Sequence, residues 1–158
     1  MQPSYKRLID RWAAQGLKIA TGATDGEVVS FESQNAVVLP EDFRNYFLKV
    51  NGMVQDFENS CDRIGFAFWP LSLVTSVTKE CAKRSSPVPA LKDPERYFVF
   101  ADYLQWSWAY AIHLDANSPD TNQVIHVGTL RPKVIANSFT AFVNLYLQDA
   151  RELYTDAA

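Results

Sequence analysis

Residues 97–128 read YFVFADYLQWSWAYAIHLDANSPDTNQVIHVG, and this stretch decides the fold class. Its segments 97–102, 108–114 and 123–128 are rich in β-branched and aromatic residues, and turn-forming residues such as 115–122 separate them. β-Branched and aromatic side chains fit a pleated, half-buried surface, whereas Asn, Asp, Ser and Pro favour turns. The stretch therefore predicts three strands of an antiparallel meander.

Helical periodicity flanks this predicted sheet on both sides. Residues 4–15 place apolar side chains at i, i+3, i+4 and i+7, and Gly16 follows as a stop signal. Residues 139–150 carry a long apolar stripe with Ser138 as a candidate N-cap. We expect this closing helix to lie across the sheet, and residues 73–81 also show helical spacing.

A further helix is predicted to open at Pro40. Proline suits the first helical position because its missing N–H has no intrahelical partner there. Glu41 and Asp42 follow in the first turn, where acids complement the helix dipole. Asn51-Gly52 ends the pattern with two residues that readily adopt positive φ.

Residues 17–39 lack a clear period. Glycines interrupt the pattern, while 27–31 and 36–39 have the β-branched content of short strands. We interpret this part as a connecting region. Residues 65–71 are compact, apolar and aromatic, and they predict another strand.

The whole chain has the composition of a packed globular protein. It has 158 residues, of which 47% are hydrophobic and 21% charged. A chain of this length fits one domain with one sizeable core. Because helices and strands do not alternate regularly, we predict an α+β fold. We expect a single domain over residues 1–158, with a mainly antiparallel sheet packed by N-terminal and C-terminal helices.

Charge and hydropathy argue against several classes of partner. The formal net charge is only −3 and the basic residues are scattered, so no phosphate-binding footprint is visible and nucleic acid is not expected. No apolar run approaches the roughly 20 residues that span a bilayer, so no membrane partner is expected. The first thirty residues lack the pattern of a secretory signal. We therefore expect a cytoplasmic protein.

Signatures of catalysis are missing from the sequence. It contains no G-x-G-x-x-G, no phosphate-binding loop and no G-x-S-x-G. His113 and His126 fall on the two arms of a predicted hairpin, where a suitable register would make them neighbours. With Asp102 or Asp115 they could bind a metal, but ordinary sheet residues are the favoured interpretation. We expect no enzyme activity and no metal site.

Two cysteines and one acidic pair have structural explanations. Cys61 and Cys81 are too few for a disulfide framework and lack zinc-site spacing, so we predict two buried thiols. A bridge between them stays open, and Arg63 could lower the pKa of the Cys61 thiol if that side chain were exposed. Glu41 with Asp42 is explained by the helix dipole alone.

An unusual concentration of large aromatic residues occurs where a strand connection should be polar. Residues 102–108 read DYLQWSW, and some of these aromatic side chains should be exposed. Exposed aromatics are favoured anchors in protein interfaces, although half or more of these could simply be core. Our candidate partner-binding residues are Asp102, Tyr103, Trp106, Trp108 and Asp115.

Several segments together resemble the SUKH superfamily. LPEDF at 39–43, followed by Tyr46-Phe47 and Asn51-Gly52, is similar to the family's Leu/Ile-Pro-x-x-hydrophobic, helix, Asn-Gly signature. FWPL at 68–71 looks like the strand that follows it in the family. The likeness continues through the segments that match the central strand, the next two strands and the closing helix, namely 97–102, 110–115, 124–127 and 137–147.

The resemblance covers most of residues 1–150, with one departure. Family members often have glycines around the turn after the central strand, whereas this chain has Ala101 and then 103–108. The superfamily includes fungal regulators of cell-wall assembly and bacterial toxin-immunity proteins. The long flanks of the fungal regulators are missing, which favours the compact bacterial type. The resemblance thus implies an α+β fold, no cofactor, and a cytoplasmic antidote that binds and blocks a toxin domain.

Three functional hypotheses follow. The first is an immunity protein whose mildly acidic surface suits a basic toxin domain, so that binding weakens with salt. The second is a regulatory adaptor or scaffold with an endogenous protein partner. The third is a small-ligand-binding protein or enzyme that uses His113 and His126. The oligomeric state and the identity of any toxin do not follow from the sequence.

Overall fold

The computed structural model describes residues 3–55, 61–128 and 131–154, which contain five α-helices and six β-strands. The helices are α1 (Pro3–Ala14), α2 (Asp25–Asn35), α3 (Glu41–Lys49), α4 (Val77–Lys83) and α5 (Phe139–Leu147). The strands are β1 (Phe66–Phe68), β2 (Thr75–Ser76), β3 (Tyr97–Tyr103), β4 (Trp108–His113), β5 (Val124–Val127) and β6 (Lys133–Ala136). None of the helices in these ranges is long and apolar enough to cross a bilayer.

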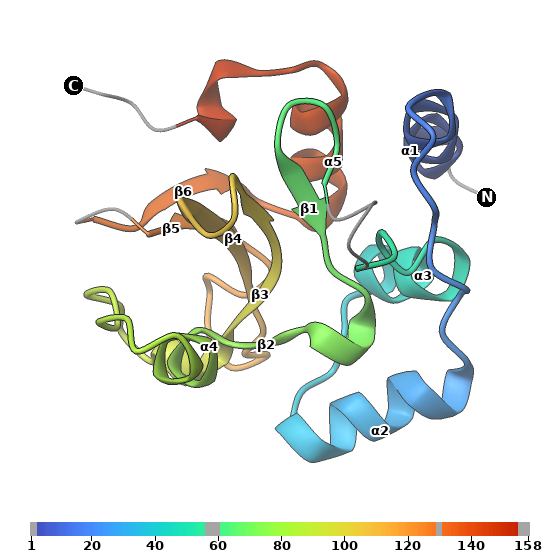
Figure 1. Ribbon diagram of the computed structural model, residues 1–158. Coiled ribbons are helices and arrows are strands. Elements are labelled where there is room, and N and C mark those ends of the chain that lie inside the picture. The colour runs from blue at the N-terminus through green and yellow to red at the C-terminus, as the bar shows by residue number, and fades with distance from the viewer. Residues whose placement is uncertain (1–2, 56–60, 129–130, 155–158) are drawn as a thin grey trace.

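All the strands belong to one antiparallel sheet (Figure 1). Its order is β1-β3-β4-β5-β6, and β2 pairs with the same strand, β3, that β1 pairs with. The central strands β3, β4 and β5 follow one another directly, which confirms the predicted meander and the α+β class. The edge strand β6 was not predicted, because four residues that begin with Lys133 and leave Val134 half exposed carry no clear strand pattern.

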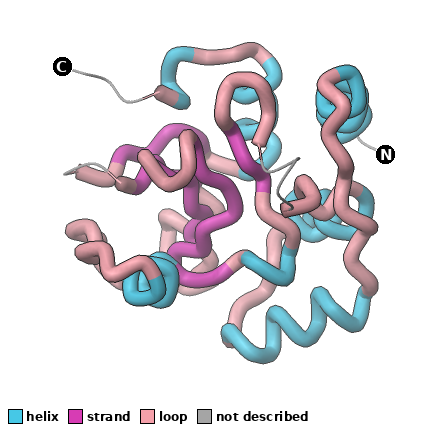
Figure 2. The backbone as a smooth tube through the Cα atoms, viewed as in Figure 1, coloured by secondary structure: helices cyan, strands magenta, loops and turns pink. Residues whose placement is uncertain are grey.

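The larger core lies between one face of the sheet and helices α1, α3 and α5 (Figures 1 and 2). Its centre is aromatic. The Phe142 ring of α5 lies 5.1 Å from Tyr110 of β4, and the Phe43 ring of α3 lies 5.6 Å from Phe100 of β3. Such ring pairs contribute about 0.5–1.5 kcal/mol beyond the area that they bury. The closing helix therefore does lie across the sheet, and Ser138 caps it as predicted.

A smaller core covers the opposite face of the sheet. Val77 and Cys81 of α4 pack there against the sheet residues Val99 and Ile125. Ala109 and Ala111 of β4 are fully buried on this face, and their small side chains leave room for α4. Of the predicted helical spacing at 73–81, only the part from Val77 onward is α-helix, because β2 pairs with β3 just before it.

The interpretation of residues 17–39 as a connecting region was wrong, because helix α2 occupies 25–35 and includes the strand-like segment 27–31. The other strand-like segment, 36–39, forms neither helix nor strand. A capping box begins α2: the Thr24 hydroxyl accepts from the Glu27 backbone N–H, and Glu27 accepts in return from the Thr24 backbone N–H. Val28 and Phe31, three residues apart, are buried on one side of the helix. Capping and burial together outweigh the modest strand preference of Val-Val-Ser-Phe. Ala36 then ends the helix in the left-handed conformation.

The helix expected at Pro40 is confirmed, with one change at its start. Pro40 is extended (φ −61°, ψ 153°) and precedes the helix, so α3 begins at Glu41. Asn51 and Gly52 follow the helix with φ of 52° and 72°. The Asn51 side chain donates to the Thr21 carbonyl and accepts from the Leu71 N–H, both at 2.8 Å. This pair therefore joins three segments as well as ending a helix.

Candidate protein-binding site

The tight connection between β3 and β4 is the most unusual backbone in the described residues. Tyr103 pairs with Trp108, and Leu104, Gln105 and Trp106 in between all have positive φ, at 47°, 53° and 73°. The left-handed conformation costs a residue with a side chain roughly 1–2 kcal/mol. Glycine would avoid that cost. The chain instead holds three side-chain-bearing residues in this conformation at the end of the sheet.

Neighbouring segments hold this hairpin in place. The Leu104 N–H donates to the Gly65 carbonyl at 3.0 Å, and the Ser107 N–H donates to Tyr103 at 3.0 Å. Gly65 and Gly128 lie on either side with φ of 114° and 120°. A Cβ at Gly65 would lie 2.6 Å from the Leu104 side chain, and one at Gly128 would lie 2.8 Å from the Trp108 Cα. The strained hairpin is therefore fixed by its surroundings.

The Trp106 ring packs against the guanidinium of Arg84. The Arg84 guanidinium lies 4.2 Å from the centre of the Trp106 ring and 5.9 Å from that of Trp69. The two indoles are nearly parallel, with an interplanar angle of 23° and centres 6.3 Å apart. Arg84 is itself held by Glu80, at 2.9 Å. A cation over an indole face is stabilising, so the half-buried Trp106 has a defined orientation.

Asp102 lies beneath this stack and is 7% exposed. Its carboxylate accepts from the Trp69 indole N–H at 3.3 Å. Burial raises the pKa of the Asp102 carboxyl, and the hydrogen bond from Trp69 and the charge of Arg84 work in the opposite direction. Asp102 therefore supports the Trp69–Trp106 pair and has little surface of its own to offer a partner.

A pocket of about 620 Å³ opens beside Trp106. Its walls are mainly apolar, and they come from the loop that follows α4 and from the end of β5. They include Cys81, Val88, Trp106, Val127 and Gly128. Leu104 and Val88 are 51% and 44% exposed, so the hairpin and this loop both present apolar side chains to solvent. We call Arg84, Val88 and Trp106, with the pocket, the hairpin surface.

The other candidate residues from the sequence lie elsewhere. Tyr103 and Trp108 are on the opposite face of the sheet, where their rings stack with centres 4.4 Å apart and Trp108 donates to the Tyr110 hydroxyl at 2.7 Å. Both are partly exposed. Asp115 follows the far end of β4 and lines a separate pocket of about 320 Å³. The structure thus brings Asp102 and Trp106 together and separates the other three from them.

The two histidines do not face each other. His126 pairs with Tyr110, while His113 pairs with Tyr97 and stacks on its ring at 4.3 Å. Tyr110 and His113 are three residues apart on β4, so the two histidines point to opposite faces of the sheet. Within the described ranges, no three or more His, Cys, Asp or Glu side chains gather to hold a metal ion.

The cysteines differ from the prediction of two buried thiols. Cys81 is buried, but Cys61 is exposed, and the two are not bridged. The structure buries the next residue instead: Asp62 is 5% exposed, and one of its oxygens accepts the backbone N–H groups of Ile64, Gly65 and Phe66 at 2.8–2.9 Å. That turn directs the carboxylate inward and leaves the neighbouring thiol outside.

Asp42 also has a role that sequence reasoning missed. Its carboxylate accepts from the backbone N–H and the hydroxyl of Thr140, at 2.9 and 2.8 Å. These two hydrogen bonds tie the start of α3 to the start of α5, nearly a hundred residues later. The helix dipole alone was therefore an incomplete explanation, and no local pattern could have indicated so distant a partner.

Comparison with known proteins supports the family suggested by the sequence. A search of curated proteins found no match. The model of the SMI1 / KNR4 family (SUKH-1), however, matches residues 22–145, a range that runs from just before α2 into α5. The match includes the signature around α3, the whole described sheet and the strained hairpin. This chain therefore belongs to the SMI1/KNR4 family (SUKH-1).

Proposed function

We propose that this protein acts in the cytoplasm by binding another protein, and that its partner is a toxin domain which it neutralises as an immunity protein. Family membership supports an immunity or regulatory role. SUKH domains are generally non-enzymatic, and neither an enzyme activity nor a cofactor is part of the proposal. The observation that carries it is the strained hairpin that presents Trp106 beside an apolar pocket.

The physical argument concerns preorganisation. Binding normally costs about 0.5–1.5 kcal/mol for each flexible side chain that becomes ordered. Trp106 is already oriented by Arg84 and Trp69, so little of this cost remains. Backbone strain of this kind persists only where the surroundings enforce it, and it is concentrated at functional sites. Tryptophan and arginine are also the residue types most enriched among interface hot spots.

Charge supports the choice of a basic partner. The chain carries a formal charge of −3, and its one cation at the hairpin surface, Arg84, is already paired with Glu80. Opposite net charges accelerate encounter, and salt screens them. We expect the affinity for the toxin to fall as ionic strength rises.

Growth rescue tests the proposal. Each open reading frame that neighbours the gene is expressed alone and together with this protein. We expect one frame to arrest growth alone and to be harmless in the presence of this protein. If none of the neighbouring products is neutralised, the toxin assignment fails.

Substitutions then test the surface. Trp106→Ala should weaken toxin binding by at least tenfold, since truncating a hot-spot anchor costs about 2 kcal/mol or more. Val134→Ala, on the exposed edge strand β6, is the matched control and should bind as the wild type does. The affinities are measured by titration calorimetry, with thermal unfolding as a check that both variants fold.

A regulatory adaptor is the alternative, and it would use the same hairpin surface with an endogenous partner. It is favoured if Trp106 is needed to bind a cellular protein that is not toxic. A small-ligand site built on both histidines has no structural support, because His113 and His126 lie on opposite faces of the sheet.

A further inference from the structure

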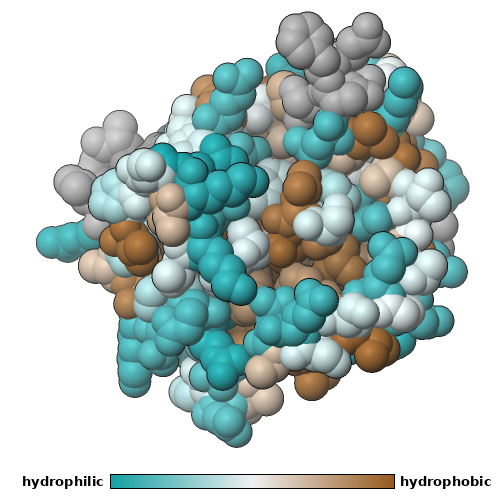
Figure 3. All heavy atoms as spheres, turned by 60° about the horizontal axis from the view of Figure 1, so that its bottom comes forward, coloured by the Kyte–Doolittle hydropathy of each residue, from teal (hydrophilic) through white to brown (hydrophobic). Residues whose placement is uncertain are grey.

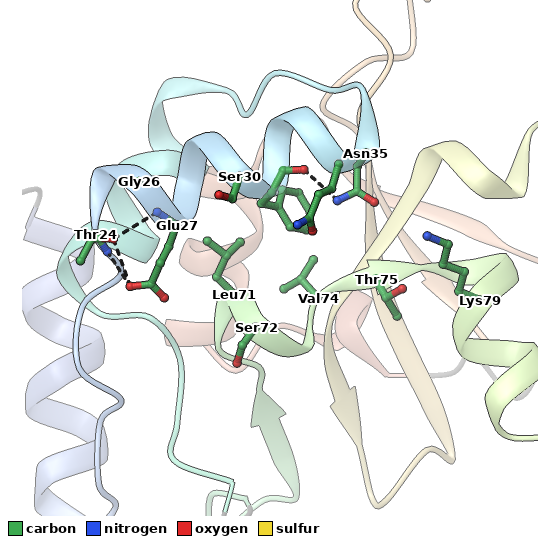
Figure 4. Close-up of a pocket in the computed structure, with 12 residues that line it drawn as sticks. Thr24, Gly26, Glu27, Ser30, Asn35, Leu71, Ser72, Val74, Thr75 and Lys79 are labelled. Carbon is green, nitrogen blue, oxygen red and sulfur yellow. Dashed lines mark hydrogen bonds between the residues drawn. The ribbon is translucent and has the colours of Figure 1, made fainter.

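A second, polar groove lies between α2 and the segment that leads into β2 and α4. It has a volume of about 640 Å³. Phe31, Leu71 and Val74 form its floor, and Figure 4 shows Leu71 and Val74 pointing toward α2. On the side of the molecule that carries α2 and α4, Figure 3 shows a hollow with an apolar floor and hydrophilic rims. We call this feature the α2 groove.

The side of α2 that lines the groove is polar. Glu27, Ser30 and Gln34 stand at i, i+3 and i+7, so they form one stripe along the helix, and all three are exposed. The apolar side of the helix, with Val28 and Phe31, packs on the protein. The polar stripe offers a carboxylate, a hydroxyl and an amide, which can hydrogen-bond to a peptide backbone.

The opposite rim of the groove is an edge of the sheet. Thr75 of β2 lines the groove, and in the described residues β2 pairs with no strand other than β3. β2 has two residues, so the backbone groups of one of them are turned away from β3 and can bond to an extended segment of another protein. Backbone bonds supply affinity in such complexes, and side-chain contacts supply specificity.

The two ends of the groove carry opposite charges. The capping box holds the Glu27 carboxylate at one end, with a distance of 3.1 Å to the Thr24 backbone nitrogen. Lys79 stands at the other end, and in Figure 4 its ammonium group points back toward Asn35. That ammonium forms no ion pair with another described residue. A bound segment would therefore be oriented by its own charges.

We propose that the α2 groove binds an extended segment of a protein partner, with a cationic side chain over Glu27, aliphatic side chains on the floor and a carboxylate at Lys79. The 11 residues of α2 span roughly 16 Å, a length covered by about five extended residues. The proposal goes beyond toxin neutralisation and does not depend on it, because the groove would bind a segment of this chemistry whether or not its protein is a toxin.

The test uses the whole protein and a library of random dodecapeptides displayed on phage. We expect the enriched sequences to share Lys or Arg and, about four residues away, Asp or Glu, with aliphatic residues in between. A synthetic peptide of that consensus should bind the wild type. If no such consensus is enriched, the proposal is overturned.

Variants locate the bound peptide. Ser30→Trp fills the groove and should reduce affinity at least tenfold, whereas Val29→Trp, on the same helix outside the groove, should leave it unchanged. Circular dichroism confirms that both variants fold. If Ser30→Trp has no effect, or if only Trp106→Ala abolishes binding, the peptide does not occupy the groove and the proposal is wrong.

Charge exchange tests the orientation. Lys79→Glu should reduce affinity for the consensus peptide at least tenfold, and a peptide whose acidic residue is replaced by Lys should regain it. Lys83→Glu, one turn further along α4 and outside the groove, is the control and should change little. If the exchanged peptide binds Lys79→Glu no better than the original peptide does, Lys79 does not contact the acidic residue.

Discussion

At the scale of single residues, Asp62 holds together parts of the chain that are far apart. One oxygen accepts three backbone N–H groups, and the other accepts the hydroxyl of Tyr146. Tyr146 in turn accepts from the Trp12 indole at 2.9 Å. Burial and the nearby Asp62 charge raise the pKa of Tyr146, so its hydroxyl stays protonated and can donate. This chain of bonds links α1, the turn before β1, and α5.

Replacing Asp62 tests that role. Asp62→Ala leaves several buried donors without an acceptor, and each such loss costs about 1–3 kcal/mol. We expect a total loss of roughly 3–4 kcal/mol in the free energy of unfolding, measured with urea. Asp10→Ala removes an exposed carboxylate that pairs with Lys6, and it should change stability by less than about 0.5 kcal/mol. Equal effects of the two substitutions would rule out the buried network.

His126 makes stability depend on pH. Burial, and to a smaller extent the charge of Lys133, lower the pKa of His126 from 6.5 to about 4. As the pH falls below 6.5, His126 of the unfolded chain becomes protonated. His126 of the folded protein becomes protonated only near pH 4, so the unfolded state is favoured in between. From this group alone, stability should fall by roughly 2 kcal/mol between pH 7 and pH 5.

The control for this prediction is His126→Phe, which cannot titrate. Its unfolding free energy should lose about 2 kcal/mol less than that of the wild type over the same interval. Urea denaturation at pH 7, 6 and 5 gives both slopes. Parallel slopes would mean that His126 titrates alike in the folded and unfolded chains.

At the scale of elements, α2 depends on its first turn. Its buried side chains are few, so the reciprocal bonds between Thr24 and Glu27 supply a large share of its stability. The sequence contained this signal, since Thr24 and Glu27 stand at capping-box spacing. Gly26 and the two valines obscured it, because they resemble a break followed by a strand. Capping residues therefore deserve more weight than β-branched content in such a segment.

Removal of the cap measures its contribution. Thr24→Ala should lower the free energy of unfolding by about 1 kcal/mol, the usual effect of losing a threonine N-cap. Thr21→Ala, three residues earlier and exposed, should stay within about 0.5 kcal/mol of the wild type. If both variants unfold alike, the bonds between Thr24 and Glu27 add nothing measurable.

The hairpin after β3 is the second element in which local conformation matters. The sequence placed a strand connection there and indicated unusual aromatics. It could not reveal that three residues would be left-handed, because the hairpin packs closely against Gly65 and Gly128 from other parts of the chain.

Glycine should relieve the hairpin of strain. Gln105 has φ of 53°, so Gln105→Gly should raise the free energy of unfolding by about 0.5–1 kcal/mol. Gln148→Gly changes the same residue type at φ −89°, just after α5, and should instead lower it by up to about 1 kcal/mol. Both free energies are measured by urea denaturation. If both variants lose stability, the hairpin holds no strain that glycine relieves.

At the scale of the whole molecule, periodicity was enough to predict the α+β class, the meander and the helices at both ends. These features follow from repeated local patterns and one buried face. The candidate site was predicted less well, since Asp102, Tyr103 and Trp108 share one short segment but alternate across the sheet. Side-chain alternation separates neighbours in the sequence, and only the register shows which of them meet.

The sheet also separates the main hydrophobic core from the surface that we propose for partner binding. One face packs the large aromatic core, while the face under α4 builds the smaller core and supports the hairpin surface. Arg84 illustrates this division, because it extends from the end of α4 to the Trp106 ring. The surface that we propose for partner binding is thus anchored in the smaller of the two cores.

The most direct test of protein binding is a comparative affinity capture from the native cells. Tagged wild type, Trp106→Ala and Val134→Ala are purified in parallel, eluted with rising salt and analysed by quantitative mass spectrometry. We predict one polypeptide, in near-equal amount to the bait, that is recovered with the wild type and with Val134→Ala and is lost with Trp106→Ala. If no recovered polypeptide depends on Trp106, this protein does not act by binding a partner through the hairpin surface.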